Sequence, residues 1–116
     1  MRGKGKILNL VYSLINSFLR LDIRYFSSCH ISFILKGHTH IPHPIGIVIG
    51  KGVVVGENVT IMQNVTIGVA RLGAKAAPII GNNVFIGAGA VVVGDINVGD
   101  GIIIKANDVV TKSRYA

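Results

Sequence analysis

Residues 80–110 read IGNNVFIGAGAVVVGDINVGDGIIIKANDVV, with an aliphatic residue at every sixth position. The same six-residue period runs through residues 49–67, ahead of a break. The leading aliphatic positions of these repeats are Ile49, Val55, Ile61, Ile67, Ile80, Ile86, Val92, Val98, Ile104 and Val110. A small or β-branched residue usually follows four places later, and only the last repeat, which has Asp108 there, departs from this pattern. A short fixed period of this kind is typical of a solenoid.

The six-residue period predicts the local structure, because six residues suffice for one short extended strand and a corner. Three such strands close a triangular coil whose leading aliphatic side chains point inward, and glycine helps the backbone to turn at the corners. Coils stacked as parallel strands stabilise one another, as in other repeat proteins. We therefore predict an all-β fold, a left-handed parallel β-helix. An antiparallel sandwich or an ordinary barrel would instead show two-residue alternation and variable spacing.

The period breaks between Ile67 and Ile80, which are 13 residues apart. We expect residues 69–78 to form a loop that leaves the edge of a coil. Gly73 gives this loop flexibility, and Arg71 and Lys75 could reach a ligand or a neighbouring subunit. The simpler interpretation is a solvated loop with incidental charges.

The composition is that of a single domain of 116 residues with a net charge of +7. Residues 1–36 carry six Lys and Arg side chains against a single acid, Asp22, and the rest is closer to balance. No recognition motif accompanies this basic segment, so we expect no nucleic-acid partner. Cys29 is the only cysteine, which excludes an intramolecular disulfide and a thiolate zinc cluster and favours a reducing cytoplasm.

Residues 1–36 are predicted to form an amphipathic helix, over about residues 6–24, and a connector. The apolar stripe of this helix either packs on the domain or a neighbouring subunit, or lies on the inner membrane surface as a peripheral contact. Polar residues interrupt the stretch and no cleavage site follows, so it is a poor signal peptide. It also lacks an uncharged apolar stretch long enough to span a bilayer.

Residues 37–44, GHTHIPHP, form a turn-rich entry to the repeats and contain three histidines. His43 falls one hexad before Ile49, at a leading position, so either the register ends there or chemistry overrides packing. Histidine exchanges a proton near neutral pH, although a capping or buried structural role is the common alternative. His38 and His40 could join His43 around a metal, but no carboxylate is nearby to complete the set, and we expect no metal site.

Three stretches resemble one known family: residues 43–50 (HPIGIVIG), 64–68 (NVTIG) and 78–90 (PIIGNNVFIGAGA). They are similar to the serine acetyltransferase-like branch of the hexapeptide acyltransferases, and the resemblance covers residues 37–113. It implies an acyltransferase domain over residues 37–116, a homotrimer with active sites between subunits, acetyl-coenzyme A (acetyl-CoA) as the donor and a hydroxyl as the acceptor.

The resemblance also implies roles for individual residues. The family's catalytic histidine falls on His43, as the general base that takes the proton of the acceptor hydroxyl. The donor contacts fall on Gly87, Ala88 and Ala106, where small side chains let the pantetheine arm approach the backbone. Lys105 could attract the cofactor's phosphates. Glycine and alanine at these places also suit the turns of a coil, so a purely structural role stays open.

Some features depart from the serine acetyltransferase pattern. Ala77 precedes Pro78, where those enzymes have a second histidine that helps to hold the acceptor. Their large N-terminal helical domain and their usual C-terminal tail have no counterpart. In that loop and in its brevity the chain is more similar to related enzymes that acetylate sugars in surface polysaccharides, so we expect a cytoplasmic O-acetyltransferase that acts on a sugar hydroxyl in surface polysaccharide synthesis. The alternatives are serine O-acetylation in cysteine synthesis and a non-catalytic β-helix that serves as a structural or assembly module.

Overall fold

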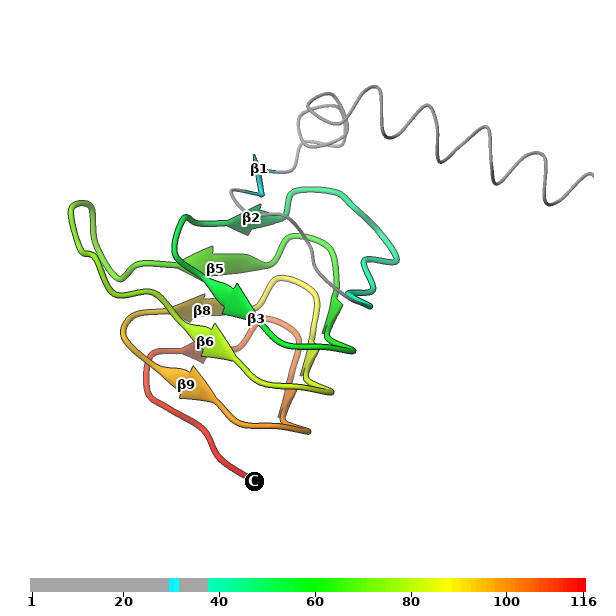
Figure 1. Ribbon diagram of the computed structural model, residues 1–116. Helices are drawn as coiled ribbons and strands as arrows, with labels where there is room; N and C mark the ends of the chain where they lie inside the picture. The colour runs from blue at the N-terminus through cyan, green and yellow to red at the C-terminus, as the bar shows by residue number, and fades with distance from the viewer. Residues whose placement is uncertain (1–29, 32–37) are drawn as a thin grey trace, which may run out of the picture.

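The computed structural model describes residues 30–31 and 38–116, and within them every regular element is a short β-strand (Figure 1). The strands are β1 (His30–Ile31), β2 (Val48–Ile49), β3 (Val54–Val55), β4 (Thr60–Ile61), β5 (Thr66–Gly68), β6 (Ile79–Ile80), β7 (Phe85–Ile86), β8 (Val91–Val93), β9 (Asn97–Val98), β10 (Ile103–Ile104) and β11 (Val109–Val110). The predicted N-terminal helix, over about residues 6–24, lies outside the described residues.

All strand pairs are parallel, and they form three sheets that wrap around one axis. We call these sheets the β2 face (order β1-β2-β5-β8-β11), the β4 face (β4-β7-β10) and the β3 face (β3-β6-β9). From β2 onward, consecutive strands belong to different faces, so each turn of the chain contributes one strand to each face, as Figure 1 shows. The prediction of an all-β fold of stacked parallel coils is confirmed for the described residues.

The core is a column of aliphatic side chains inside the coils. Of the predicted leading positions, all are exposed by 2% or less except Val55, which is half-buried against the column. Among the described residues, no polar or charged residue is buried as a whole. Burial of each Ile or Val contributes roughly 1.5–3 kcal/mol. Asp108, the exception in the pattern, avoids this column because its carboxylate turns to Arg114 Nη1 at 3.4 Å.

Three stacks of corners join the faces, and we name them by what they carry. The histidine corner (residues 42–46, 62–64, 87–89 and 105–107) joins the β4 face to the β2 face. The amide corner (residues 56–58, 81–83 and 99–101) joins the β3 face to the β4 face. The loop corner (residues 50–52, 69–78, 94–95 and 111–113) joins the β2 face to the β3 face. Positive φ angles of about 60° occur at Asn58, Asn64, Asn83 and Asn107, which all lie in the first two stacks. Asparagine tolerates this conformation better than most other residues do.

Residues 69–78 leave the coil between β5 and β6 and project from the loop corner (Figure 1). The side chain of Leu72 near the tip is fully exposed, and Gly73 has a φ of 84°. The loop closes on itself through a hydrogen bond of 3.2 Å from the Ala74 N–H to the Arg71 carbonyl oxygen. An exposed leucine and two cations are thus held away from the column, at the edge of the β2 face.

Candidate active site

His43 lies in the first described corner of the histidine stack, outside the aliphatic column. The preceding residues run parallel to β4, because the His40 N–H donates to the Val59 carbonyl at 2.8 Å and the Ile61 N–H donates to the His40 carbonyl at 2.9 Å. This register aligns Ile41 with Ile61, and Ile41 packs against the core. Of the two alternatives, the first therefore holds: the six-residue register ends before His43, which lies outside the leading positions. Its corner, residues 42–46, is two residues longer than residues 62–64 of the next coil.

The extra length of this corner presents His43 on a stiff piece of backbone. Pro42 and Pro44 flank it, and each proline ring restricts the backbone to a narrow range of φ. The Ile45 N–H donates to the His43 carbonyl at 2.7 Å, and the Asn64 N–H of the next coil donates to the Ile45 carbonyl at 2.9 Å. The side chain of His43 is exposed, and no described residue hydrogen-bonds to its ring. An imidazole in this setting can exchange a proton with a bound molecule.

The residues predicted to contact the donor lie in the same corner stack as His43. Ile45, Gln63, Ala88 and Ala106 form one row. The carbonyl oxygens of the first three accept hydrogen bonds of 2.8–3.0 Å from the N–H groups of Asn64, Gly89 and Asn107 in the next coil. Parallel strands lie about 4.8 Å apart, so this row extends for roughly 14 Å along the axis from the coil of His43. A long flexible molecule lying on the row would place one end beside His43.

The structure distinguishes the roles of the predicted donor residues. Gly87 is buried, and a Cβ there would lie 2.5 Å from the backbone nitrogen of Ala106, so stacking of the next coil is enough to require glycine. Ala88 is half-buried, whereas Ala106 and Lys105 are exposed. Ala88, Lys105 and Ala106 thus have atoms that a ligand can reach, and Gly87 serves the coil.

Gln63 is a residue of this row that the sequence analysis missed. Its side-chain oxygen Oε1 is buried and accepts no hydrogen bond from any described residue. An unsatisfied buried amide oxygen costs about 1–3 kcal/mol, which makes it an unusual feature of a stable coil. The sequence could have indicated Gln63, because it is the one polar residue in this row. The aligned positions in the other coils, Ile45, Ala88 and Ala106, are all apolar.

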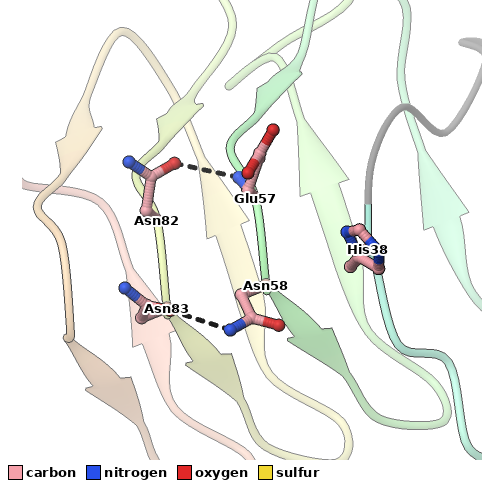
Figure 2. A pocket seen from close by; sticks show the side chains of 5 residues that line it. All are labelled: His38, Glu57, Asn58, Asn82 and Asn83. Atoms are coloured by element: carbon pink, nitrogen blue, oxygen red, sulfur yellow. Dashed lines mark hydrogen bonds between the residues drawn. The ribbon is translucent and has the colours of Figure 1, made fainter.

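A second feature is a polar cavity of about 270 Å³ at the amide corner, lined by His38, Glu57, Asn58, Asn82 and Asn83. Figure 2 shows the lining side chains on successive coils. His40 lies beside it, with Nε2 at 3.3 Å from Asn58 Oδ1. The three histidines therefore do not gather around one point: His38 and His40 lie beside the amide corner, and His43 lies in the histidine corner. Within the described part of the chain, no three His, Cys, Asp or Glu side chains are placed to hold a metal ion.

Ala77 lies at the loop corner, where it is partly buried against the aliphatic column. The loop corner and the histidine corner flank opposite edges of the β2 face. The face is spanned by about four residues of extended chain, roughly 13 Å, which separates Ala77 from His43 within one chain. A site that needs both regions would require two copies of the chain.

Comparison with known proteins identifies relatives of the repeat region. No protein-family model matches the chain. A serine acetyltransferase from Mycobacterium tuberculosis is 42% identical over 84 residues, which are 72% of this chain and 37% of that protein. Serine acetyltransferase isoform 3 from Entamoeba histolytica, solved in complex with cysteine, matches with a TM-score of 0.59 and 38% identity over 66% of this chain and 29% of that one. Soybean serine acetyltransferase complexed with serine matches with a TM-score of 0.61 and 35% identity over 66% of this chain and 34% of that one.

The chain thus spans little more than a third of the length of the curated relative from Mycobacterium tuberculosis. The likeness to the solved structures supports the left-handed parallel β-helix predicted from the repeats. In the described part of the chain, no helix is long and apolar enough to cross a membrane.

Replacing Gln63 by leucine tests whether its side-chain oxygen lacks a hydrogen-bond partner in the folded protein. Leucine has a similar shape and removes the orphaned oxygen, so we expect Gln63→Leu to keep the free energy of unfolding or to raise it by about 1–3 kcal/mol. Urea denaturation followed by circular dichroism measures this change. A loss of more than about 1 kcal/mol would mean that the amide has a partner in the folded protein and is not an orphan.

Proposed function

We propose that this chain, whose repeat domain belongs to the serine acetyltransferase-like branch of the hexapeptide-repeat acyltransferases, transfers an acetyl group from acetyl-CoA to a hydroxyl, with His43 as the general base. The observation that carries the proposal is the position of His43. It is exposed on a corner stiffened by two prolines, at the head of a row that ends in the small side chains of Ala88 and Ala106.

In the proposed reaction the His43 imidazole acts first as a base and then as an acid. His43 accepts the proton of the acceptor hydroxyl as the oxygen forms a bond to the acetyl carbonyl carbon. The carbon–sulfur bond then breaks, and His43 returns the proton to the leaving thiolate. The stiff corner contributes because a positioned base loses little orientational freedom when the two substrates bind.

The donor fits the row on the histidine corner. Ala88 and Ala106 leave room for a chain to lie close to the backbone, and Lys105 adds a positive charge beside Ala106. A phosphate near Lys105 would be stabilised by that charge. The thioester end would then lie toward the coil of His43, two to three coils away along the row.

Serine is the first acceptor to consider, because the relatives are named serine acetyltransferases. These comparisons favour the serine alternative over the sugar acceptor that we expected from the sequence. One observation keeps the sugar as the second candidate: the chain has Ala77 where the resemblance implies an acceptor-binding histidine, and Ala77 has no polar group to offer a serine carboxylate.

We expect the acceptor to be identified by thiol release from acetyl-CoA, measured with serine and with nucleotide-linked sugars in parallel. Turnover with serine that saturates, and no turnover with sugars, is the expected result. Turnover with a sugar alone would reverse the order of the two candidates. Threonine, which adds a methyl group at the same hydroxyl carbon, is the matched control for the size of the acceptor pocket.

The expected consequence of removing the base is a large loss of rate without loss of fold. We expect His43→Ala to lower kcat by about 10²- to 10⁴-fold, because proton transfer by a positioned base contributes that much. His40→Gln, a change of an exposed histidine three residues away, is the control and should keep kcat. Unaltered turnover in His43→Ala would remove His43 as the base. Absence of thiol release by the unmodified chain with every acceptor would favour the non-catalytic module.

We also propose that copies of the chain associate through the β2 face to form the homotrimer that the resemblance implies. Its outward side chains form a row of β-branched residues in register, Val48, Thr66, Val91 and Val109. Val48 and Val109 are 41% and 64% exposed in the single chain. Association on this face would bring the loop corner of one copy near the histidine corner of another. The proposed setting is the cytoplasm, and contact of the N-terminal segment with a membrane concerns residues outside the described part.

A charge on the β2 face should weaken this association. We expect Val109→Asp to shift the chain toward the monomer in sedimentation velocity, because a buried unpaired carboxylate is costly. Val54→Asp is the matched control, since Val54 is 54% exposed on the β3 face. An equal shift toward the monomer in both variants, or such a shift only in Val54→Asp, would mean that the β2 face is not the interface.

A further inference from the structure

The cavity at the amide corner is held open by a hydrogen-bonded ladder between coils. Asn82 Oδ1 accepts the Glu57 N–H at 2.9 Å, and Asp100 Oδ1 accepts the Asn82 N–H at 2.7 Å. Asn58 Nδ2 donates to Asn83 Oδ1 at 3.1 Å. Figure 2 shows the first and third of these bonds as two rungs, with His38 on the preceding coil. The side chains of Asn58, Asn82 and Asn83 are therefore fixed by their neighbours before any ligand binds.

The ladder uses only some of the hydrogen-bonding groups of these side chains. The positive φ angles of Asn58 and Asn83 and the rungs explain why asparagine suits the corner. Among the described residues, no acceptor is bonded to Nδ2 of Asn82 or of Asn83, and no donor is bonded to the Glu57 carboxylate. The ring of His38 has no hydrogen-bond partner within the described part either. Two amide donors, one carboxylate acceptor and one imidazole therefore remain for a ligand.

These remaining groups point to a neutral ligand rich in hydroxyls. An anion is disfavoured, because the lining includes the Glu57 carboxylate and no Lys or Arg. A metal ion is disfavoured, because within the described residues no three ligating side chains gather. A hydroxyl both donates and accepts a hydrogen bond, so neighbouring hydroxyls can satisfy the amides, the carboxylate and the imidazole together.

An exposed aromatic residue two positions beyond the cavity lining narrows the ligand class further. Phe85 follows Asn83 by two residues, and its side chain is 40% exposed on the outer surface of the β4 face. It lies in register between Thr60 and Ile103, so its neighbours on the two adjacent strands are uncharged. An exposed ring beside fixed hydrogen-bonding groups suits the apolar face of a sugar ring with its hydroxyls directed into the cavity. We propose that the cavity at the amide corner, with Phe85, is a saccharide-binding site.

The position of this site relates it to the proposed chemistry. The amide corner and the histidine corner bound the same β4 face, and residues 58–62 cross that face in roughly 13 Å of extended chain. An oligosaccharide held at the cavity and over Phe85 can therefore extend toward His43. If the proposed acetyl transfer holds, on which this last step rests, the sugar candidate gains a binding site for its acceptor.

The test is a titration of the full isotope-labelled chain with two neutral probes, maltotriose and the trisaccharide of N-acetylglucosamine, followed by NMR. We expect at least one probe to give saturable shifts of the amide signals of Asn82, Asn83 and Phe85. Asn83→Gly keeps the positive φ and has a precedent in the next coil, where Gly101 takes the aligned place with a φ of 73°. It should weaken binding by about tenfold, the effect of losing one hydrogen bond.

A second pair of variants separates stacking from general surface change. Phe85→Leu keeps an apolar side chain but removes the ring, and it should weaken binding. Ile103→Leu on the same face is the matched control and should bind as the unmodified chain does. No saturable shift with either trisaccharide, or shifts that survive both Asn83→Gly and Phe85→Leu, would overturn the proposal.

Thiol release from acetyl-CoA distinguishes this inference from the proposed function. Saccharide binding without any acetyl transfer would leave the binding site intact and would contradict the proposed activity. Acetyl transfer to serine with no saccharide binding would keep the activity and overturn the inference. Acetyl transfer to a probe, lowered in kcat/KM by Asn83→Gly with kcat kept, would support both.

Discussion

The parallel hydrogen bonding of each coil to the next, around a dry aliphatic column, is the constraint on which the rest of the structure depends. It aligns residues at fixed offsets along the chain. Phe85 pairs with Ile103 and Asn82 contacts Asp100, in both cases 18 residues apart, which is three strands of six. Where the offset differs, the chain has left the coil. Thr60 pairs with Phe85, and Glu57 contacts Asn82, at a distance of 25 residues because the 69–78 loop intervenes. His40 pairs with Thr60 at a distance of 20 because the corner of His43 is longer. The second of these departures contains His43, which we assign to function.

The same constraint explains which features could be predicted from the sequence. The column needs an aliphatic side chain at every leading position, so the period of six specifies the core, the parallel sheets and the loop between Ile67 and Ile80. The position of His43 could not be obtained in this way. Only one coil precedes Ile49 in the described chain, and two extra residues in a single corner shift the register without any later repeat to reveal it. Ile41 takes the inward place, which the sequence alone does not distinguish from a place two residues later.

Residues whose role depends on the stacking of side chains were also beyond the reach of the pattern. Gly87 matched the expectation of a small residue at a ligand site, yet its close approach to the Ala106 backbone is a property of two coils together. The orphaned oxygen of Gln63 and the amide ladder of Glu57, Asn58, Asn82 and Asn83 arise in the same way. Corner asparagines have a clear local purpose at positive φ. Which of their amide groups remain able to bind a ligand can be determined only from the structure, because it shows which amide groups already form hydrogen bonds between coils.

The geometry of a three-sided column gives a ligand two different directions in which to approach a corner. A molecule lying along a corner meets one residue from each coil, about 4.8 Å apart, and the row from Ile45 to Ala106 has this character. A molecule lying across a face meets the outward residues of the strands instead, such as Phe85 on β7. His43 lies where the row of the histidine corner and the β4 face meet. A donor along the corner and an acceptor across the face would therefore reach the same imidazole without competing for the same surface, as a reaction between two bound substrates requires.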